Sequence, residues 1–214
     1  MMRMRIVGAL AALAVSAVAL PASAATYFLN LTDAQTGLAT PYGQVEVTEG
    51  TDALNFVVTL FDGLKFTDTG MGHSAFTFSL TGAPVVTYSV PTGFTFIRSP
   101  DAVQNSPFSY FDYGVTCSDN CRPNDGGYAG PLSFSIGGAG LTLASLAAAT
   151  GTFGGQTVLF AADTISTQGV TGAIGGGTLG GSVPEPATWA MMILGMGMVG
   201  MGLRLRRRPE ATLA

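Results

Sequence analysis

Hydrophobic and polar residues alternate with a period of two through most of the chain between Thr26 and Thr178. β-Branched and aromatic residues occupy one set of positions and Thr, Ser, Gln or Glu the other, which is typical of strands with one buried face. The clearest stretches are 43–49, 54–60, 75–80, 85–90, 93–97, 132–136 and 157–165. Turn-forming sequences such as FDGLKF, TGAP and PNDGGY separate these stretches.

About eight short strands of this kind predict an all-β fold, an antiparallel β-sandwich of jelly-roll type, over residues 25–168. Residues 141–149 are the one helical candidate, although their glycine flanks also fit a turn. Residues 169–182 hold seven glycines in 14 positions, which predicts a flexible linker rather than a packed strand.

Residues 1–24 have the three parts of a secretory signal peptide. Two arginines give a basic start, residues 6–20 are apolar, and the small residues Ala22 and Ala24 form an A-x-A cleavage pattern. We expect the Sec translocon to export the chain and signal peptidase to cut it after Ala24. The alternative is an uncleaved membrane anchor, which needs roughly 20 apolar residues, more than this run supplies.

Export would place Cys117 and Cys121 in an oxidising compartment, where an even number of cysteines favours a disulfide. The loop between them is so short that the bridge would contribute about 2 kcal/mol at most. A C-x-x-x-C metal site and two free thiols are the alternatives. A four-ligand zinc site of Cys and His cannot be completed, because the chain has a single His.

Oxygen-bearing side chains gather around this cysteine pair, at Asp119, Asn120, Asn124 and Asp125, before two glycines. They could hold calcium, but their spacing differs from that of an EF-hand loop. Asn, Asp and Gly are also ordinary turn residues, which explains the same sequence without a metal. No cofactor is expected.

Charged residues make up 10% of the chain, and they are distributed unevenly. Residues 25–183 contain three cationic side chains and eleven carboxylates, a net charge of −8. Such an acidic body excludes nucleic acid and anionic lipid surfaces as electrostatic partners.

Candidate chemistry in the body is sparse, and we expect no enzyme. A Ser-His-Asp triad would have to use His73, which lies in a glycine-rich turn without a nearby G-x-S-x-G elbow. Exposed aromatic rings beside Thr- and Ser-lined strands would suit sugar stacking, and Tyr110 and Tyr113 are the candidates for it. The alternative is that these aromatic rings lie in the core.

The C-terminal segment predicts one membrane-spanning helix over about residues 187–205. Its 19 residues contain one arginine and reach roughly 28 Å, close to the thickness of a hydrocarbon core. Trp189 suits the outer interface, and the basic cluster Arg204, Arg206, Arg207 and Arg208 suits the cytoplasmic side. A buried helix of a soluble protein is the alternative. Pro184 and Pro186 keep the preceding tripeptide extended, as a processing site requires.

The order of motif, apolar run and basic cluster over residues 183–208 resembles the PEP-CTERM sorting signal, in its PEP-x-x-W-A form, found in Gram-negative bacteria that make exopolysaccharide. The resemblance implies recognition by exosortase, with removal of the helix and release or surface attachment of the body. The residues that carry it are Pro184, Glu185, Pro186, Trp189, Ala190 and the arginines from Arg204 to Arg208.

The body is also similar to uncharacterised exported proteins with this tail, most visibly in DTGMGHSAFTFSL. Similar tails occur on ice-binding proteins, which adds ice binding as an alternative. The sequence thus predicts an exported, non-enzymatic protein that is anchored in the inner membrane until exosortase acts and then works at the cell surface in an exopolysaccharide or biofilm matrix. A carbohydrate-binding adhesion module is the main alternative, and a secreted hydrolase is the second.

Overall fold

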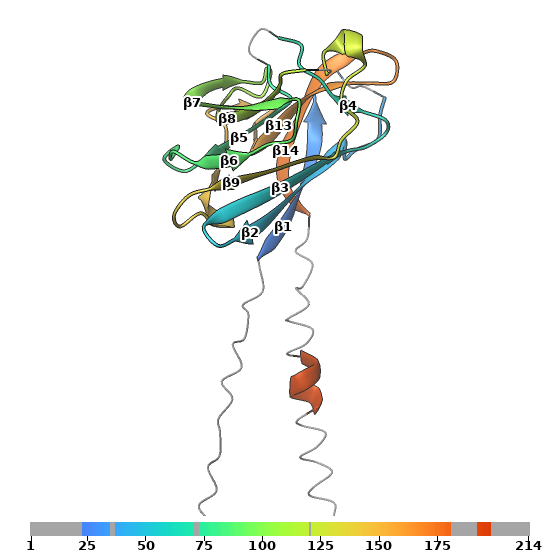
Figure 1. The fold of residues 1–214 in the computed structure, drawn as a ribbon. Helices are drawn as coiled ribbons and strands as arrows, with labels where there is room; N and C mark the ends of the chain where they lie inside the picture. The colour runs from blue at the N-terminus through green and yellow to red at the C-terminus, as the bar shows by residue number, and fades with distance from the viewer. Residues whose placement is uncertain (1–22, 35–36, 71–72, 120, 181–191, 198–214) are drawn as a thin grey trace, which may run out of the picture.

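The computed structural model describes residues 23–34, 37–70, 73–119, 121–180 and 192–197. Residues 23–180 form an antiparallel, all-β body with two short 3₁₀ turns (Figure 1). The strands are β1 (Ala24–Thr32), β2 (Gly43–Gly50), β3 (Ala53–Leu60), β4 (Lys65–Phe66), β5 (Phe76–Leu80), β6 (Thr87–Ser89), β7 (Phe94–Gln104), β8 (Tyr110–Cys117), β9 (Leu132–Gly137), β10 (Leu146–Ala147), β11 (Thr152–Phe153), β12 (Gln156–Thr157), β13 (Phe160–Ile165) and β14 (Thr171–Gly180). The turns are η1 (Pro123–Asp125) and η2 (Leu143–Ser145).

Twelve strands belong to one continuous sheet, in the order β6-β9-β3-β2-β1-β14-β13-β5-β8-β7, with β10 and β4 as side branches. The strands at the two ends of this order, β6 and β7, follow each other in the chain. Tyr88 of β6 stacks on Phe96 of β7, with ring centroids 4.6 Å apart. The sheet therefore curls until its edges approach, which makes it nearly closed and barrel-like. The all-β, antiparallel expectation is confirmed, whereas a two-sheet sandwich is not.

Aromatic rings fill the inside of the curled sheet. Phe56 stacks on Phe134, with centroids 4.6 Å apart, and Phe78 stacks on Tyr113 at 5.0 Å. Phe160 joins them from β13. Burial of each such ring contributes about 2 kcal/mol, and favourable ring pairs add about 1 kcal/mol. The alternating aromatic residues seen in the sequence therefore form one face of the sheet.

A second, smaller cluster lies on the outer face of β13, β14 and β8. Phe108 and Phe111 pack there with Ala161 and Ala173, and Phe153 covers them. This outer cover explains why all five residues of β5 are buried. The expected polar face of β5 is therefore internal, and Thr77 donates its hydroxyl hydrogen to the carbonyl oxygen of Ala161 at 3.3 Å.

The glycine-rich segment is not a linker over residues 171–180, where the expectation is wrong. It forms β14, which pairs with β1 on one side and β13 on the other. Glycine is needed because the neighbours leave no room: a Cβ at Gly175 would lie 3.0 Å from the Phe108 ring, and one at Gly177 would lie 2.6 Å from Cβ of Leu159. The domain therefore extends to Gly180, beyond the expected boundary at 168.

Other differences from the expected elements are local. The helical candidate 141–149 is instead the turn η2 followed by β10. The expected strand 85–90 pairs only over Thr87–Ser89, and the one at 157–165 begins its pairing in the main sheet at Phe160. The expected stretches do not include strands β1 and β8, although every second residue of each strand is apolar or aromatic.

Candidate functional site

The two ends of the body lie together at one end of the sheet. Thr26 near the start of β1 pairs with Gly180 at the end of β14. We call this the proximal end (Figure 1). At the opposite, distal end, Ile165 pairs with Lys65 of β4, and Phe66 forms a β-bridge with Tyr128. The turn η1 and the disulfide belong to this distal end.

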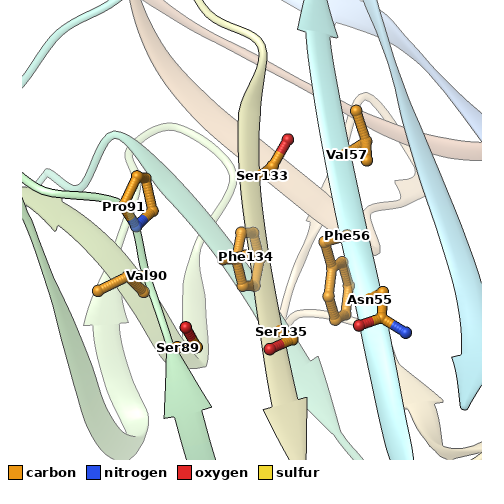
Figure 2. Close-up of a pocket in the computed structure, with 9 residues that line it drawn as sticks. All are labelled: Asn55, Phe56, Val57, Ser89, Val90, Pro91, Ser133, Phe134 and Ser135. Carbon is orange, nitrogen blue, oxygen red and sulfur yellow. The ribbon is translucent and has the colours of Figure 1, made fainter.

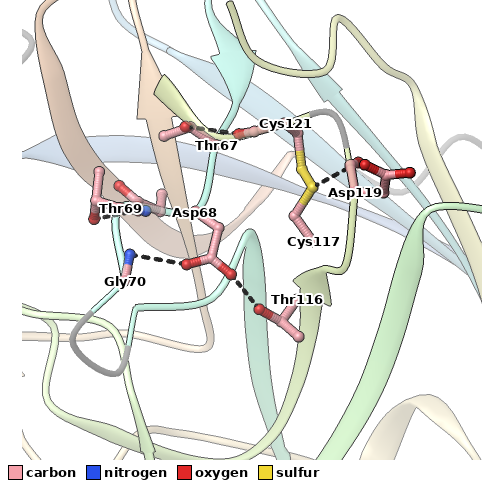
Figure 3. Close-up of a disulfide and its surroundings, with 9 residues drawn as sticks. Thr67, Asp68, Thr69, Gly70, Thr116, Cys117, Asp119 and Cys121 are labelled. Carbon is pink, nitrogen blue, oxygen red and sulfur yellow. Dashed lines mark hydrogen bonds between the residues drawn. A yellow bond between two sulfur atoms is a disulfide. The ribbon is translucent and has the colours of Figure 1, made fainter. Parts of the chain in front are cut away.

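Cys117 and Cys121 are joined by a disulfide, with Cα atoms 6.0 Å apart. Cys117 ends β8, and the Cys121 carbonyl oxygen accepts hydrogen bonds from the Thr67 hydroxyl at 2.9 Å and from the Asp68 N–H at 3.3 Å. The Asp68 carboxylate accepts a hydrogen bond from the Thr116 hydroxyl (Figure 3). The disulfide loop is therefore tied to the segment after β4 rather than hanging free.

A hollow of about 340 Å³ opens beside this disulfide, and we call it the distal hollow. Its base is partly aromatic: the Tyr128 ring lies edge to face against Phe94, with centroids 5.1 Å apart. The Tyr128 hydroxyl donates to the Pro131 carbonyl at 3.2 Å, which fixes the ring. The hollow is lined by Thr92, Gly93, Phe94, Ser118, Asp119, Cys121 and Tyr128.

A second hollow of about 390 Å³ lies on the side of the sheet, where the chain after β6 leaves β9 (Figure 2). We call it the lateral hollow. Ser133, Ser135 and Asn55 project into it, whereas Phe134 and Phe56 are buried beneath it. Its lining mixes Asn55 and three serines with Val57, Val90 and Pro91, and it offers no open aromatic face.

His73 lies next to a buried carboxylate, which sequence reasoning missed. Its Nδ1 is 4.0 Å from Oδ2 of Asp163, a residue only 1% exposed. The same Oδ2 accepts hydrogen bonds from the Thr69 N–H at 2.8 Å and the Thr69 hydroxyl at 2.6 Å. Burial raises the pKa of Asp163 above its usual value, and the Thr69 hydrogen bonds and His73 oppose that shift. A period-two strand pattern cannot reveal this contact, because the residues are 90 positions apart.

The structure separates the two tyrosines suggested for sugar stacking. Tyr113 is fully buried against Phe78, so its proposed place on a binding surface is wrong. Tyr110 is 44% exposed. The two residues are three positions apart on β8, and an odd separation along a strand puts side chains on opposite faces.

Of the suggested calcium ligands, Asp119 and Asp125 are exposed, and Asn120 lies outside the described residues. Within residues 23–180, apart from the short gaps, no group of three His, Cys, Asp or Glu side chains is placed to hold a metal ion.

Most of the predicted targeting residues lie outside the described part of the chain. These are Ala22 of the cleavage pattern, the sorting residues from Pro184 to Ala190 and the basic cluster from Arg204 to Arg208. Ala24, by contrast, is the first residue of β1, so cleavage after it would leave the strand from Ala25 onward.

The expected span at 187–205 is described only over residues 192–197, which are helical. In the part of the chain that the structure describes, no helix is both long and apolar enough to cross a membrane.

Comparison with protein-family models identifies a motif in the C-terminal segment of the chain. Residues 182–208 match the model of the PEP-CTERM protein-sorting motif. The chain thus carries a sorting motif that implies export, processing by exosortase and a cell-surface or extracellular destination. Comparisons with curated proteins and with solved structures found no match, so the body's expected likeness to other exported proteins stays a prediction.

Proposed function

We propose that this chain is an exported protein that residues 187–205 hold in the inner membrane until exosortase cuts near the Pro-Glu-Pro, after which the β-body works at the cell surface in an exopolysaccharide matrix, without catalysis of its own. The observation that carries the proposal is the sorting motif at residues 182–208. The hydrophobic run and the following arginines supply a stop with the body outside.

The end of β14 sharpens how this processing would work. Gly180 is still in the sheet, and Pro184 follows four residues later. Four residues span about 14 Å at most when fully extended. Exosortase would therefore act close to the folded sheet, because the flexible linker expected there is mostly a strand.

Intact-mass spectrometry of the protein recovered from its own cells tests this proposal. We expect a mature polypeptide that begins at Ala25 and ends near residue 186. Glu185→Ala should leave the tail uncut, whereas Glu210→Ala, a matched change beyond the basic cluster, should be processed normally. A mature surface protein that still carries residues 189–208 would contradict the proposal.

The non-enzymatic part of the proposal has its own test at His73. A Ser-His-Asp triad in this chain would have to use His73, whose Nδ1 lies 4.0 Å from Oδ2 of Asp163 without a hydrogen bond between them. We expect purified protein to show no hydrolysis of ester or glycoside substrates above background. Activity that disappears in His73→Ala, while Thr69→Ala keeps it, would make the body a hydrolase.

A further inference from the structure

We propose that the distal hollow binds one or two sugar units of an extracellular polysaccharide that is either neutral or carries amino groups. This site would give the proposed function a ligand. It rests on the proposed function in one respect, namely that the body is exported and so meets extracellular polysaccharide. The hollow lies at the small end of the volumes usual for small-molecule sites.

A pyranose ring presents apolar C–H groups and polar hydroxyl groups. The lining of the distal hollow has a complementary surface for each kind. Tyr128 lines the hollow and contributes apolar ring atoms against which the C–H groups of a sugar can pack. Thr92 and Ser118 offer hydroxyl groups, and Asp119 offers a carboxylate that accepts hydrogen bonds from sugar hydroxyls. The lateral hollow has polar groups without an open ring, so it suits this ligand less well.

The Asp119 side chain is available for a ligand. It is exposed, and within the described residues its carboxylate makes no hydrogen bond or ion pair. Figure 3 shows it pointing away from the disulfide, while the backbone of the same residue stays close to it. An exposed carboxylate at the rim of a hollow can bind a hydroxyl without first giving up an internal partner.

The backbone around the distal hollow is held in place before any ligand binds. The Gly93 carbonyl accepts hydrogen bonds from the N–H groups of Ser118 at 2.9 Å and Asp119 at 3.3 Å. The disulfide fixes Cys121, and Tyr128 exchanges two backbone hydrogen bonds with Phe66 at 2.8 and 2.7 Å. A fixed site loses less conformational entropy on binding, so the short disulfide has a role in shaping this hollow rather than in stabilising the fold.

The negative charge of the body restricts which polysaccharides can bind in the distal hollow. Residues 25–183 carry a net charge of −8, and Asp119 lines the hollow itself. A polyuronate would be repelled, whereas a neutral glucan or an amino-sugar polymer would not. The site also lies at the distal end, away from Gly180, where the tail leaves the sheet. A body held by its C-terminal end therefore presents the distal hollow outward.

Calorimetric titration of the full-length protein in detergent tests the site independently of sorting. The probes are cello-oligosaccharides, chitosan oligosaccharides and, as the anionic counterpart, alginate oligosaccharides. We expect binding to one or both of the first two and none to alginate. Asp119→Asn should weaken that binding about tenfold through loss of charge-assisted hydrogen bonds. Asp125→Asn, also exposed at this end but not part of the lining, should change it less than twofold.

A second variant replaces Tyr128, and its folding is checked separately because this ring also packs on Phe94 and Phe66. Tyr128→Leu should abolish binding while circular dichroism shows an unchanged β-spectrum, and Asn55→Ala in the lateral hollow should have no effect. Binding to alginate alone, no binding to any of the probes, or equal binding by wild type and Asp119→Asn would overturn the assignment. Sorting is read separately by intact mass, so normal processing without sugar binding would refute the distal site alone.

Discussion

Strands β5 and β14 lie on either side of β13 in the same sheet, yet they are built from opposite kinds of residue. Strand β5, FTFSL, fills space with two phenylalanines and a leucine on its inner face. Strand β14, TGAIGGGTLG, has five glycines and leaves space for others to fill. The Phe108 ring and Leu159 pack where its side chains would be. A strand in this sheet can therefore be specified either by its own side chains or by the shape of its neighbours.

The largest expected effect tests strand β5, whose own side chains fill the core. Phe78→Ala removes a fully buried ring that contacts Phe56, Tyr113 and Phe134, so it should lower the free energy of unfolding by about 3–5 kcal/mol. Urea denaturation followed by tyrosine fluorescence measures it. Phe153→Ala, at a partly buried ring, should cost clearly less; equal losses would mean that the inner cluster is not the main core.

The glycine-rich strand β14 is tested by adding one methyl group to it. A Cβ at Gly175 would lie 3.0–3.1 Å from the Phe108 ring, so Gly175→Ala should destabilise the protein by about 1–3 kcal/mol. Gly50→Ala is the control, since its Cβ would meet its neighbours at an ordinary 3.5 Å. Phe108→Leu should cost less in the Gly175→Ala background than in wild type, which a double-mutant cycle detects. Strict additivity would show that the ring does not require the glycine.

Removal of the disulfide should matter less than either change in the sheet. Cys117→Ser with Cys121→Ser opens a loop with a sequence separation of four, for which about 2 kcal/mol is the upper limit. Thermal unfolding of the double variant and of reduced wild type should agree. A loss as large as that of Phe78→Ala would mean that the distal end, rather than the aromatic core, determines stability.

The smallest expected effect concerns β13 itself, between the two strands. Burial raises the pKa of Asp163, so the folded state holds its proton more tightly than the unfolded state does. The associated stability is fully present below the ordinary carboxyl pKa and is lost as pH rises through the raised value. Asp163→Asn keeps an acceptor for Thr69 and cannot ionise, so it should be more stable than wild type near pH 8. Its advantage should vanish in acid, as denaturation at both pH values would show; a constant difference would refute this account. Asp68 and His73 are the titratable neighbours.

The comparison also shows what could be predicted from the sequence. Strands β2, β3 and β9 were predicted closely because their alternating residues report burial directly. Strand β14 was missed because the cause of its glycines lies in Phe108 and Leu159, which only the folded chain brings near. Cysteine spacing indicated the disulfide loop, and the aromatic residues Tyr110 and Tyr113 suggested a sugar surface. The contact that brings Tyr128 to the distal hollow could not be predicted, because its β-bridge partner Phe66 lies 62 positions earlier.

The pairing of β14 on both sides has a mechanical consequence. A pull between Gly180 and the distal end acts along the strand, while its hydrogen bonds to β1 and β13 lie across that direction. Such a force strains both ladders together instead of opening them one bond at a time. If the body is tethered through this strand, as proposed, it should resist being torn from its anchor by flow, although half of the strand's residues are glycine.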